Sequence, residues 1–319
     1  MTDKRRFPSP TLNLHQLEIF YAVAQRLNIS AAAADLRLTQ PAVSIQIKAL
    51  EKSLGIRLLD RSGPKLRLTQ AGDALYRCAV SILHAKDEAL RSIEELSAAT
   101  KGKLILGANI TGGMYLLPRI VRKFKEFHPE TEVLFEIETT DRICERILQS
   151  AVDMGVVGGP TDDRRFGAEA ICPDPIAMIV SPAHPLANHR AVSVRELDDQ
   201  PCILPAQGSR TRQLVEKKLR DAGAKPRIVM QLFGTEAVKK AVEANLGIGF
   251  VSGYAIERER ALGELKAIRL KGLDLTRNME LIYRKQKYFS PVAQRFKDFV
   301  HAYAREHLGA GPAALRAGR

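Results

Sequence analysis

The feature that most constrains the fold is an uninterrupted heptad pattern between Ala71 and Ala99. Its seam positions are spaced alternately by four and three residues, and they are Leu75, Ala79, Ile82, Lys86, Ala89, Ile93 and Leu96. This period predicts one long helix with a continuous seam in which Lys86 is the single charged member. Such a seam is typical of a helix that pairs with another helix, and packing onto its own domain is the alternative.

This helix separates two segments that differ in charge. Residues 1–72 hold 11 Lys and Arg against 5 Asp and Glu, so they carry +6 of the net charge of +13 in under a quarter of the length. A concentrated basic segment indicates a polyanionic partner. A generally basic soluble protein is the alternative explanation of the charge.

The sequence of the basic segment predicts three short helices. Asn13 is a candidate N-cap of the first, Ser30 of the second and Thr39 of the third. Pro41 then falls in the first turn of the third helix, where its missing N–H costs nothing, and Gly55 ends that helix. Three helices within about 45 residues have helix-turn-helix proportions.

A short hairpin follows the third helix. Ser62-Gly63-Pro64 is a turn signal between two apolar-alternating runs, which predicts a small β-hairpin, or wing. Four basic residues and one acid lie in this stretch, the basic ones being Arg57, Arg61, Lys65 and Arg67.

The third helix carries an aliphatic residue on the side opposite to its apolar stripe. At 100° per residue the predicted buried stripe consists of Val43, Ile47, Leu50 and Leu54. Ile45 projects the other way, beside Lys48 and Lys52, and Gln40 and Ser44 lie on the flank. An amide, a hydroxyl, an aliphatic group and an amine together suit the base edges of the DNA major groove. A solitary surface aliphatic or a protein contact would also explain Ile45.

From Lys103 onward the chain alternates between strands and helices, which predicts an α/β fold with mainly parallel sheets and room for two lobes. The predicted strands are 103–108, 133–138, 154–158, 176–180, 201–204, 228–233, 248–252 and 279–283. The predicted helices are 112–127, 141–150, 209–222, 235–245 and 290–307. We expect residues 1–11 to be a flexible head, "TKGK" (100–103) a hinge and the "GAGPAALRAGR" tail disordered.

Four strand-to-helix junctions are rich in small and hydroxyl residues: "GANITGG" (107–113), "ETTD" (138–141), "AQGSRTR" (206–212) and "FGTE" (233–236). Ligands of open α/β sheets bind at such junctions, where helix N–H groups and hydroxyls can hold a small anion. Ordinary N-capping is the alternative. Arg210 and Arg212 fall in a first helical turn, where cations oppose the helix dipole, which can mark a functional site. Solvated arginines are the simpler alternative.

The stretch "SAAAADLRLTQPAVSIQIKALEKSLGIRLLDRSGPKLRLTQAG" resembles the winged helix-turn-helix of the LysR-type transcriptional regulators. The matched elements are the Ala-Ala pair before Leu36, "TQPAVS", "I..LE..LG..L..R" and "LT.AG". The resemblance extends over the whole chain. It implies a winged helix-turn-helix (1–72), a linker helix (73–101) that dimerises, and a two-lobed effector domain like periplasmic binding proteins (102–319).

The resemblance also implies how the lobes and sites are arranged. Lobe I would hold 102–173 and 277–308, and lobe II 174–276, with crossings near Pro173–Pro175 and Thr276–Asn278. The predicted contacts with double-stranded DNA are Ser30, Gln40, Pro41, Ser44, Ile45, Lys48, Arg61, Lys65 and Arg67. The predicted contacts with a small, anionic effector are Ile110, Thr111, Gly112, Thr139, Thr140, Gln207, Gly208, Ser209, Arg210 and Thr235. Dimers would pair into tetramers, and RNA polymerase is a further partner of such regulators.

Two positions depart from the family pattern. Ile45 stands where many members carry a polar or basic residue, which leaves the base preference there open, and Leu59 replaces a common Phe. The stretch "TEAVKKAVEANLGIGFVS" is most like that of members that control carbon fixation or sulfur assimilation.

The sequence lacks common motifs of nucleotide-binding proteins and of hydrolytic enzymes. The sequence has no GxxxxGK[ST], GxGxxG or GxSxG, so we expect no enzyme activity, catalytic residue or cofactor. Four cysteines without CxxC spacing predict reduced thiols in a cytoplasmic protein and no metal site. "MTDKRRFPSP" leads into no apolar region, and no apolar run reaches the roughly 20 residues of a membrane span, so we expect neither a signal peptide nor a membrane partner.

Three other classes remain as alternatives. A solute-binding transport component would fit the C-terminal half alone, and export to the periplasm would identify it. An enzyme fused to a DNA-binding head would show a bound chromophore or turnover. A sequence-indifferent nucleoid protein would bind competitor DNA equally well.

Overall fold

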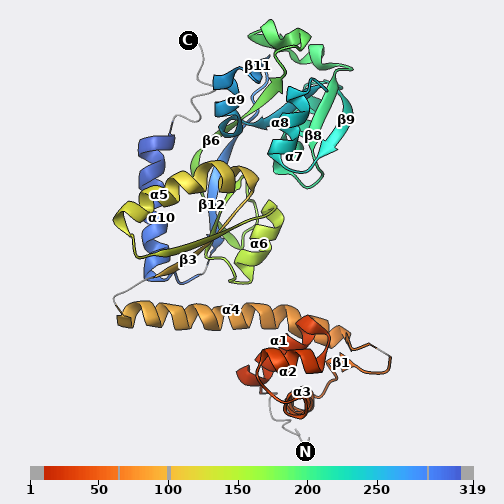
Figure 1. The fold of residues 1–319 in the computed structure, drawn as a ribbon, viewed down its shortest axis with the longest axis vertical. Coiled ribbons are helices and arrows are strands. Elements are labelled where there is room, and N and C mark those ends of the chain that lie inside the picture. Colours follow the sequence, from red (N-terminus) through yellow and green to blue (C-terminus); the bar gives the residue numbers. More distant parts are fainter. Residues whose placement is uncertain (1–10, 64, 99–101, 286, 310–319) are drawn as a thin grey trace, which may run out of the picture. The chain divides into compact units, whose positions relative to one another are not determined.

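The computed structural model describes residues 11–63, 65–98, 102–285 and 287–309 (Figure 1). The chain divides into two compact units, an N-terminal unit of residues 1–90 and a C-terminal unit of residues 91–319. Residues 1–10 of the predicted head (1–11), residues 100–101 of the predicted hinge (100–103) and residues 310–319 of the predicted tail (309–319) lie outside the described residues.

The N-terminal unit contains the three predicted helices and the wing. Helices α1 (Leu14–Arg26), α2 (Ile29–Asp35) and α3 (Gln40–Leu54) are followed by the strands β1 (Leu59–Asp60) and β2 (Arg67–Leu68) and by α4 (Gln70–Ala98). β1 and β2 pair antiparallel, with Leu59 opposite Leu68. The side chain of Asn13 caps α1 as predicted, accepting from the N–H groups of His15 and Gln16.

Helix α4 shows how its heptad seam is used along its length. Ala79 is fully buried in the core of the N-terminal unit, and Ile82 is partly buried against it. One turn later Lys86 pairs with Glu18 of α1. Farther along, the seam residue Ile93 is 62% exposed, and Leu90, which lies next to the seam, is 50% exposed. The beginning of the seam therefore packs onto its own unit, whereas Ile93 farther along is exposed.

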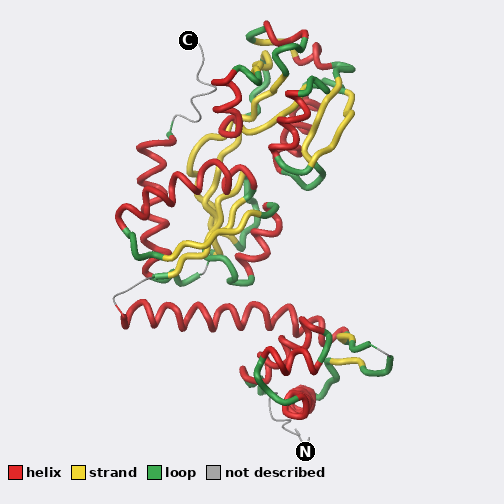
Figure 2. Tube along the Cα trace, in the orientation of Figure 1, coloured by secondary structure: helices red, strands yellow, loops and turns green. Residues whose placement is uncertain are grey.

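The C-terminal unit is built on a ten-stranded sheet flanked by helices (Figure 2). Along the sheet the strands follow the order β4 (Glu132–Ile137), β3 (Lys103–Ala108), β5 (Met154–Gly158), β12 (Thr276–Arg284), β6 (Phe166–Val180), β10 (Ile248–Ser252), β8 (Pro201–Pro205) and β9 (Arg227–Leu232). Two further strands, β11 (Lys266–Lys271) and β7 (Ala191–Ser193), extend from β6.

The prediction of mainly parallel sheets was wrong at the centre of this sheet. The pairs β3–β4, β3–β5, β8–β9 and β8–β10 are parallel, whereas β12 is antiparallel to β5 and β6, and β10 and β11 are antiparallel to β6. The antiparallel pairs meet on β6, which is 15 residues long and serves both halves of the sheet. Its residues up to Pro175 pair with β12, and those from Ile176 pair with β10.

The helices between these strands agree with the prediction within a few residues at their ends. They are the short η1 (Gly112–Leu116) continued by α5 (Leu117–Phe127), α6 (Thr140–Leu148), α7 (Arg210–Asp221), α8 (Thr235–Glu243), and α10 (Pro291–Tyr303) continued by η5 (Ala304–Leu308). The structure adds α9 (Glu257–Leu262) and the short turns η2 (Pro185–Asn188), η3 (Val194–Leu197) and η4 (Gly253–Ile256). No helix in the described ranges is both long and apolar enough to cross a membrane.

Candidate functional site

The first candidate site is the outward face of α3. Val43, Ile47 and Leu50 are fully buried, as the helical wheel predicts, whereas Ile45 is 63% exposed. Gln40, Pro41 and Lys48 are exposed and Ser44 is half-buried. The amide of Gln40 donates to the hydroxyl of Ser44 at 3.4 Å. The face therefore presents the combination of groups that the sequence predicted.

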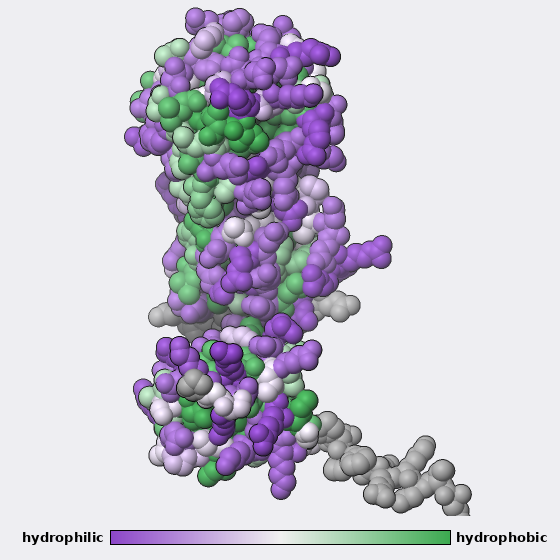
Figure 3. All heavy atoms as spheres, turned by 90° about the vertical axis from the view of Figure 1, so that its right-hand side faces the viewer, coloured by the Kyte–Doolittle hydropathy of each residue, from purple (hydrophilic) through white to green (hydrophobic). Residues whose placement is uncertain are grey.

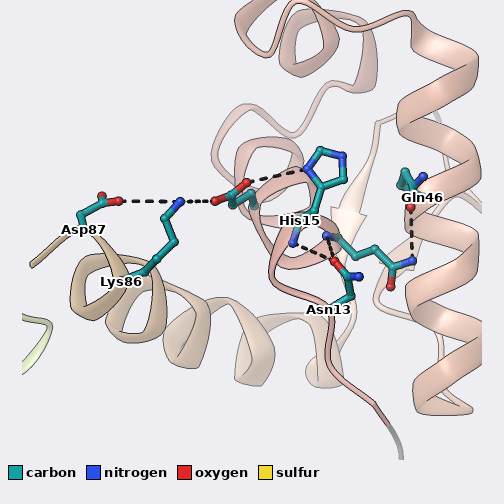
Figure 4. A network of polar contacts seen from close by, with 7 residues as sticks. Asn13, His15, Gln46, Lys86 and Asp87 are labelled. Atoms are coloured by element: carbon teal, nitrogen blue, oxygen red, sulfur yellow. Dashed lines mark hydrogen bonds and ion pairs between the residues drawn. The ribbon is translucent and has the colours of Figure 1, made fainter. Parts of the chain in front are cut away.

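Caps and cross-links hold this helix in place. Thr39 caps α3 as predicted, its hydroxyl accepting from the N–H of Ala42 at 3.3 Å. The amide of Gln16 on α1 donates to Gln46 on α3 at 3.2 Å, and Figure 4 shows this contact beside the capping Asn13. A satisfied cap and an amide link to α1 fix the direction in which the exposed face points.

The network of Figure 4 continues from α1 to α4. Lys86, labelled there, donates to Glu18, and this hydrogen bond raises the pKa of the Lys86 ammonium. Glu18 also faces His15, with 3.8 Å between the carboxylate and the imidazole nitrogen. The charge within the heptad seam thus anchors α4 to the N-terminal unit.

One predicted cap was wrong. Asn28, rather than Ser30, caps α2, and its side chain accepts from the N–H of Ala31 at 3.1 Å. Asn accepts at this position as well as Ser does, and the helix begins one residue before Ser30. Ser30 is exposed within the first turn of α2.

The wing presents unpaired positive charge. Its basic residues Arg57, Arg61, Lys65 and Arg67 are all exposed, and none forms an ion pair with a carboxylate among the described residues. Asp60 is the acid of the hairpin, and hydrogen bonds from the hydroxyl and N–H of Ser62 hold its pKa below the ordinary value. Exposed cations without partners are suited to phosphate contacts.

The second candidate site is a cavity between the two halves of the sheet in the C-terminal unit. It encloses about 670 Å³, a volume that includes its opening to solvent. The structure brings nine of the ten predicted effector residues together in its lining, namely Ile110, Thr111, Thr139, Thr140, Gln207, Gly208, Ser209, Arg210 and Thr235. They come from the ends of β3, β4, β8 and β9, where helices begin.

Gly112 was predicted to line this cavity and does not. It is the first residue of η1 and is buried. A Cβ at this position would lie 2.5 Å from the carbonyl oxygen of Val156 on β5. The glycine therefore serves close packing of η1 against the sheet and does not face the ligand space.

Helix N-termini give the cavity a positive character. The side chain of Ser209, the N-cap of α7, accepts no hydrogen bond from the helix N–H groups, and Gly234, the N-cap of α8, has no side chain that could accept one. The first N–H groups of a helix have no partners within the helix, so both ends offer donors to an anion. By contrast, Thr139 caps α6 by accepting from the N–H of Arg142.

The two arginines of "SRTR" have different roles. Arg210 lines the cavity and contacts Asp141 of α6, with 3.2 Å between a guanidinium nitrogen and a carboxylate oxygen. Arg212 is buried, and it binds Glu216 at 2.8 Å and Gln231 at 2.7 Å. Arg210 is thus available to the cavity, whereas Arg212 ties α7 to β9.

The sequence reasoning missed several lining residues. The further members are Asn109, Glu138, Pro205, Ala206, Thr211, Phe233, Gly234, Phe250, Val251, Ser252 and Arg277. Most of them adjoin predicted residues in the chain. Arg277 does not adjoin a predicted effector residue, because it lies on β12. Only its position near the predicted crossing from lobe II back to lobe I connected it with the cavity.

Comparisons with known proteins agree with this architecture. The family model "Bacterial regulatory helix-turn-helix protein, lysR family" matches residues 14–73, and "LysR substrate binding domain" matches residues 97–305. Together these matches define a class of transcription regulator that joins a helix-turn-helix to an effector-binding domain. The chain belongs to the LysR family.

Named relatives support the same assignment, and a solved structure has a similar fold. The chain is 33% identical over 290 residues to the HTH-type transcriptional activator CmpR of Synechocystis sp. (strain ATCC 27184 / PCC 6803 / Kazusa), which covers 91% of this chain and 95% of CmpR. It is 32% identical over 301 residues to the RuBisCO operon transcriptional regulator of Allochromatium vinosum, covering 94% and 99%. Full-length CbnR in complex with its target DNA has a similar fold, with a TM-score of 0.70 and 23% identity over 91% of this chain and 99% of CbnR. The two relatives are named as regulators of transcription rather than as enzymes.

Proposed function

We propose that this LysR-type regulator reads a specific DNA sequence with the outward face of α3 and responds to a small anionic metabolite in the cavity of the C-terminal unit. The observation that carries the DNA-reading part is the 63% exposure of Ile45 on a helix whose other apolar face is buried. An aliphatic group held in water beside Ser44 and Lys48 gains by contact with a thymine methyl group.

The DNA contacts divide into two kinds. Gln40, Ser44 and Ile45 would contact base edges and set the sequence preference. The exposed cations Lys48, Arg61, Lys65 and Arg67, together with the exposed residues Ser30 and Pro41, would contact the backbone and contribute affinity. Two such heads in a dimer would meet half-sites about one helical turn or a multiple apart.

Sequence preference provides the test of this docking. Gln40→Ala should reduce the ratio of specific to nonspecific affinity by roughly tenfold, because one bidentate base contact is lost. Gln294→Ala, at an exposed glutamine on α10, is the matched control and should leave the ratio unchanged. A Gln40→Ala protein with the wild-type ratio would rule out this role of the α3 face.

The anionic effector follows from the lining of the cavity. Thr111, Ser209 and Thr235 line the cavity and carry hydroxyl donors, and α7 and α8 begin beside it without side-chain caps. An effector that binds the open and closed arrangements of the two halves with different affinity would shift their equilibrium, and with it the placement of the DNA-reading heads.

Calorimetry of the full chain tests the cavity. Thr111→Val and Ser209→Ala should each weaken binding of the carboxylate or phosphate ester that binds the wild type best in a panel. Ser53→Ala, in the N-terminal unit, is the control. Undiminished affinity in both cavity variants would remove the assignment.

Exposed apolar residues support self-association. Leu90 and Ile93 on α4 would pair with the same helix of a second chain, forming a dimer. Leu134 and Phe135 on the edge strand β4, and Ile228 on the opposite edge strand β9, are each more than 40% exposed and would join dimers into a tetramer. Figure 3 shows apolar residues gathered on the side of the C-terminal unit that carries β9.

The biological setting follows from the relatives. We infer control of genes for carbon fixation, because the Allochromatium vinosum relative is named as a regulator of the RuBisCO operon. A DNA-binding regulator of this kind would act in the cytoplasm, where RNA polymerase is a partner. Footprinting on the DNA upstream of its own gene, with and without the metabolite panel, would identify the operator.

A further inference from the structure

Arg277 is a buried cation in the cavity wall whose hydrogen bonding is incomplete. Its side chain is 3% exposed, and its Nε donates to Oδ2 of Asp174 at 2.9 Å. Both terminal nitrogens, Nη1 and Nη2, are enclosed and have no hydrogen-bond partner among the described residues. A guanidinium carries five N–H donors, so four of them are left unused in a place where unpaired donors are costly.

The partner carboxylate is, by contrast, well satisfied. Asp174 is fully buried, and it accepts from Arg277 and from the hydroxyl of Ser252, which itself lines the cavity. A purely structural ion pair would satisfy both members, since an unpaired buried donor offsets the gain from the pair. The unpaired hydrogen-bonding groups of this ion pair are all N–H donors of the guanidinium. This indicates that the missing acceptors come from a ligand.

The backbone keeps this guanidinium in position. Gly158, the last residue of β5, has no side chain, and a Cβ there would lie 2.5 Å from Cζ of Arg277. The guanidinium thus occupies space that any other residue at position 158 would fill. Nε and Nη1 would each lie 2.7 Å from the same Cβ, so the guanidinium is packed against the backbone at Gly158.

The neighbourhood of Arg277 determines what that partner can be. Arg210 is the other cation of the lining, and its contact with Asp141 is largely exposed. Hydroxyls and helix N–H groups make up most of the remaining polar lining, whereas Glu138 is the single carboxylate in it. A ligand group with at least two acceptor oxygens, a carboxylate or a phosphate, matches the planar fork of a guanidinium.

We propose that Arg277 is the residue that binds the oxyanion of the effector, receiving it on Nη1 and Nη2 while Asp174 keeps Nε. The inference rests on the proposed function of the cavity and names its charge-recognising group. Asp174 and Arg277 are also direct partners in the register of β6 and β12, and β6 joins both halves of the sheet. Because both nitrogens are enclosed, the effector can bind them only if the cavity wall rearranges. Effector binding is therefore coupled to the strands that join the two halves of the sheet.

Charge-neutralising variants of the full chain separate a ligand role from a structural one. Inorganic phosphate and malonate are the probes, measured by calorimetry, with phosphate also followed by ³¹P NMR line broadening. Asp174→Asn should bind both probes about threefold or more tightly, because a competing negative charge is removed. The double variant Arg277→Gln/Asp174→Asn should bind them roughly tenfold or more weakly than Asp174→Asn, because the charged donors are gone. The single Arg277→Gln variant is avoided, since it would leave Asp174 as an unpaired buried charge.

A further variant distinguishes a specific loss of probe binding from a loss of folding in the double variant. Gly158→Ala retains both charges and displaces the guanidinium, so it should also weaken probe binding, with circular dichroism confirming the fold. If the double variant binds as tightly as Asp174→Asn while Thr111→Val and Ser209→Ala still weaken binding, Arg277 does not bind the oxyanion and the cavity function stands. If the wild type and Asp174→Asn bind neither probe, the oxyanion inference fails, and a metabolite-dependent change in the DNA footprint would show that the regulator function survives it.

Discussion

Ile45 and Ile47 form a matched pair for testing the orientation of α3. Both are isoleucines of one helix, two residues apart, and Ile45 is 63% exposed whereas Ile47 is 0% exposed. Ile47→Ala removes buried methyl groups from the core of the N-terminal unit, which costs about 2–5 kcal/mol. Ile45→Ala removes atoms that are mostly in water, so the stability should change by less than about 0.5 kcal/mol.

For DNA binding, the order of importance should be the opposite, with Ile45 mattering more than Ile47. Loss of one apolar contact with a thymine methyl group is worth about 1 kcal/mol, or roughly fivefold in affinity for the specific site. Replacing that thymine by uracil removes the same methyl group from the DNA side. Ile45→Ala on thymine DNA, and the wild type on uracil DNA, should therefore lose similar affinity, and combining the two changes should cost little more.

Hydrogen exchange of the amides in residues 14–54 measures the stability of this unit within the full chain. Binding isotherms on the two DNAs measure the contact. Equal destabilisation by Ile45→Ala and Ile47→Ala would refute the orientation. Additive losses from Ile45→Ala and uracil would refute the thymine contact.

The remaining predictions concern charge. Lys48→Ala and Arg67→Ala should each reduce the slope of log affinity against log salt by roughly 0.9, whereas Lys123→Ala on α5 should not, as salt titrations of DNA binding will measure. Burial opposes ionisation of Glu169, but hydrogen bonds from Lys297, Tyr283 and His301 outweigh it and lower its pKa. Its stabilising effect should therefore be complete above the ordinary pKa near 4.5 and be lost as the pH falls through the lower folded-state pKa. Acid titrations of unfolding should show this loss in the wild type and not in Glu169→Gln.

The N-terminal unit was the most predictable part of the chain because its signals are local. The period of Val43, Ile47 and Leu50 defined the buried face of α3, and Thr39 marked its start. Asn28 and Ser30 show the limit of such reasoning, since both can cap α2 and only the fold decides between them. The heptad seam likewise could not reveal where α4 leaves its own unit.

The cavity was predictable to the extent that junctions of strand and helix identify it. Thr111, Ser209 and Thr235 were found in this way because each adjoins the start of a helix. Arg277 and Asp174 are separated by 103 residues in the chain, and their pairing depends on the register of β6 and β12. No local pattern reports a contact of that kind, so the buried cation became visible only in the folded structure.

The most direct test of the DNA-reading claim is a photocross-link from position 45. In a Cys78→Ser background, which removes an exposed native thiol, Ile45→Cys would carry an aryl azide, and Gln25→Cys on α1 would be the control. We expect the label at position 45 to attach to bases inside the protected half-site and the label at position 25 not to reach them. Cross-links from both positions to the same extent, or none from position 45 on DNA that the protein still protects, would contradict the claim that this face of α3 lies against the bases.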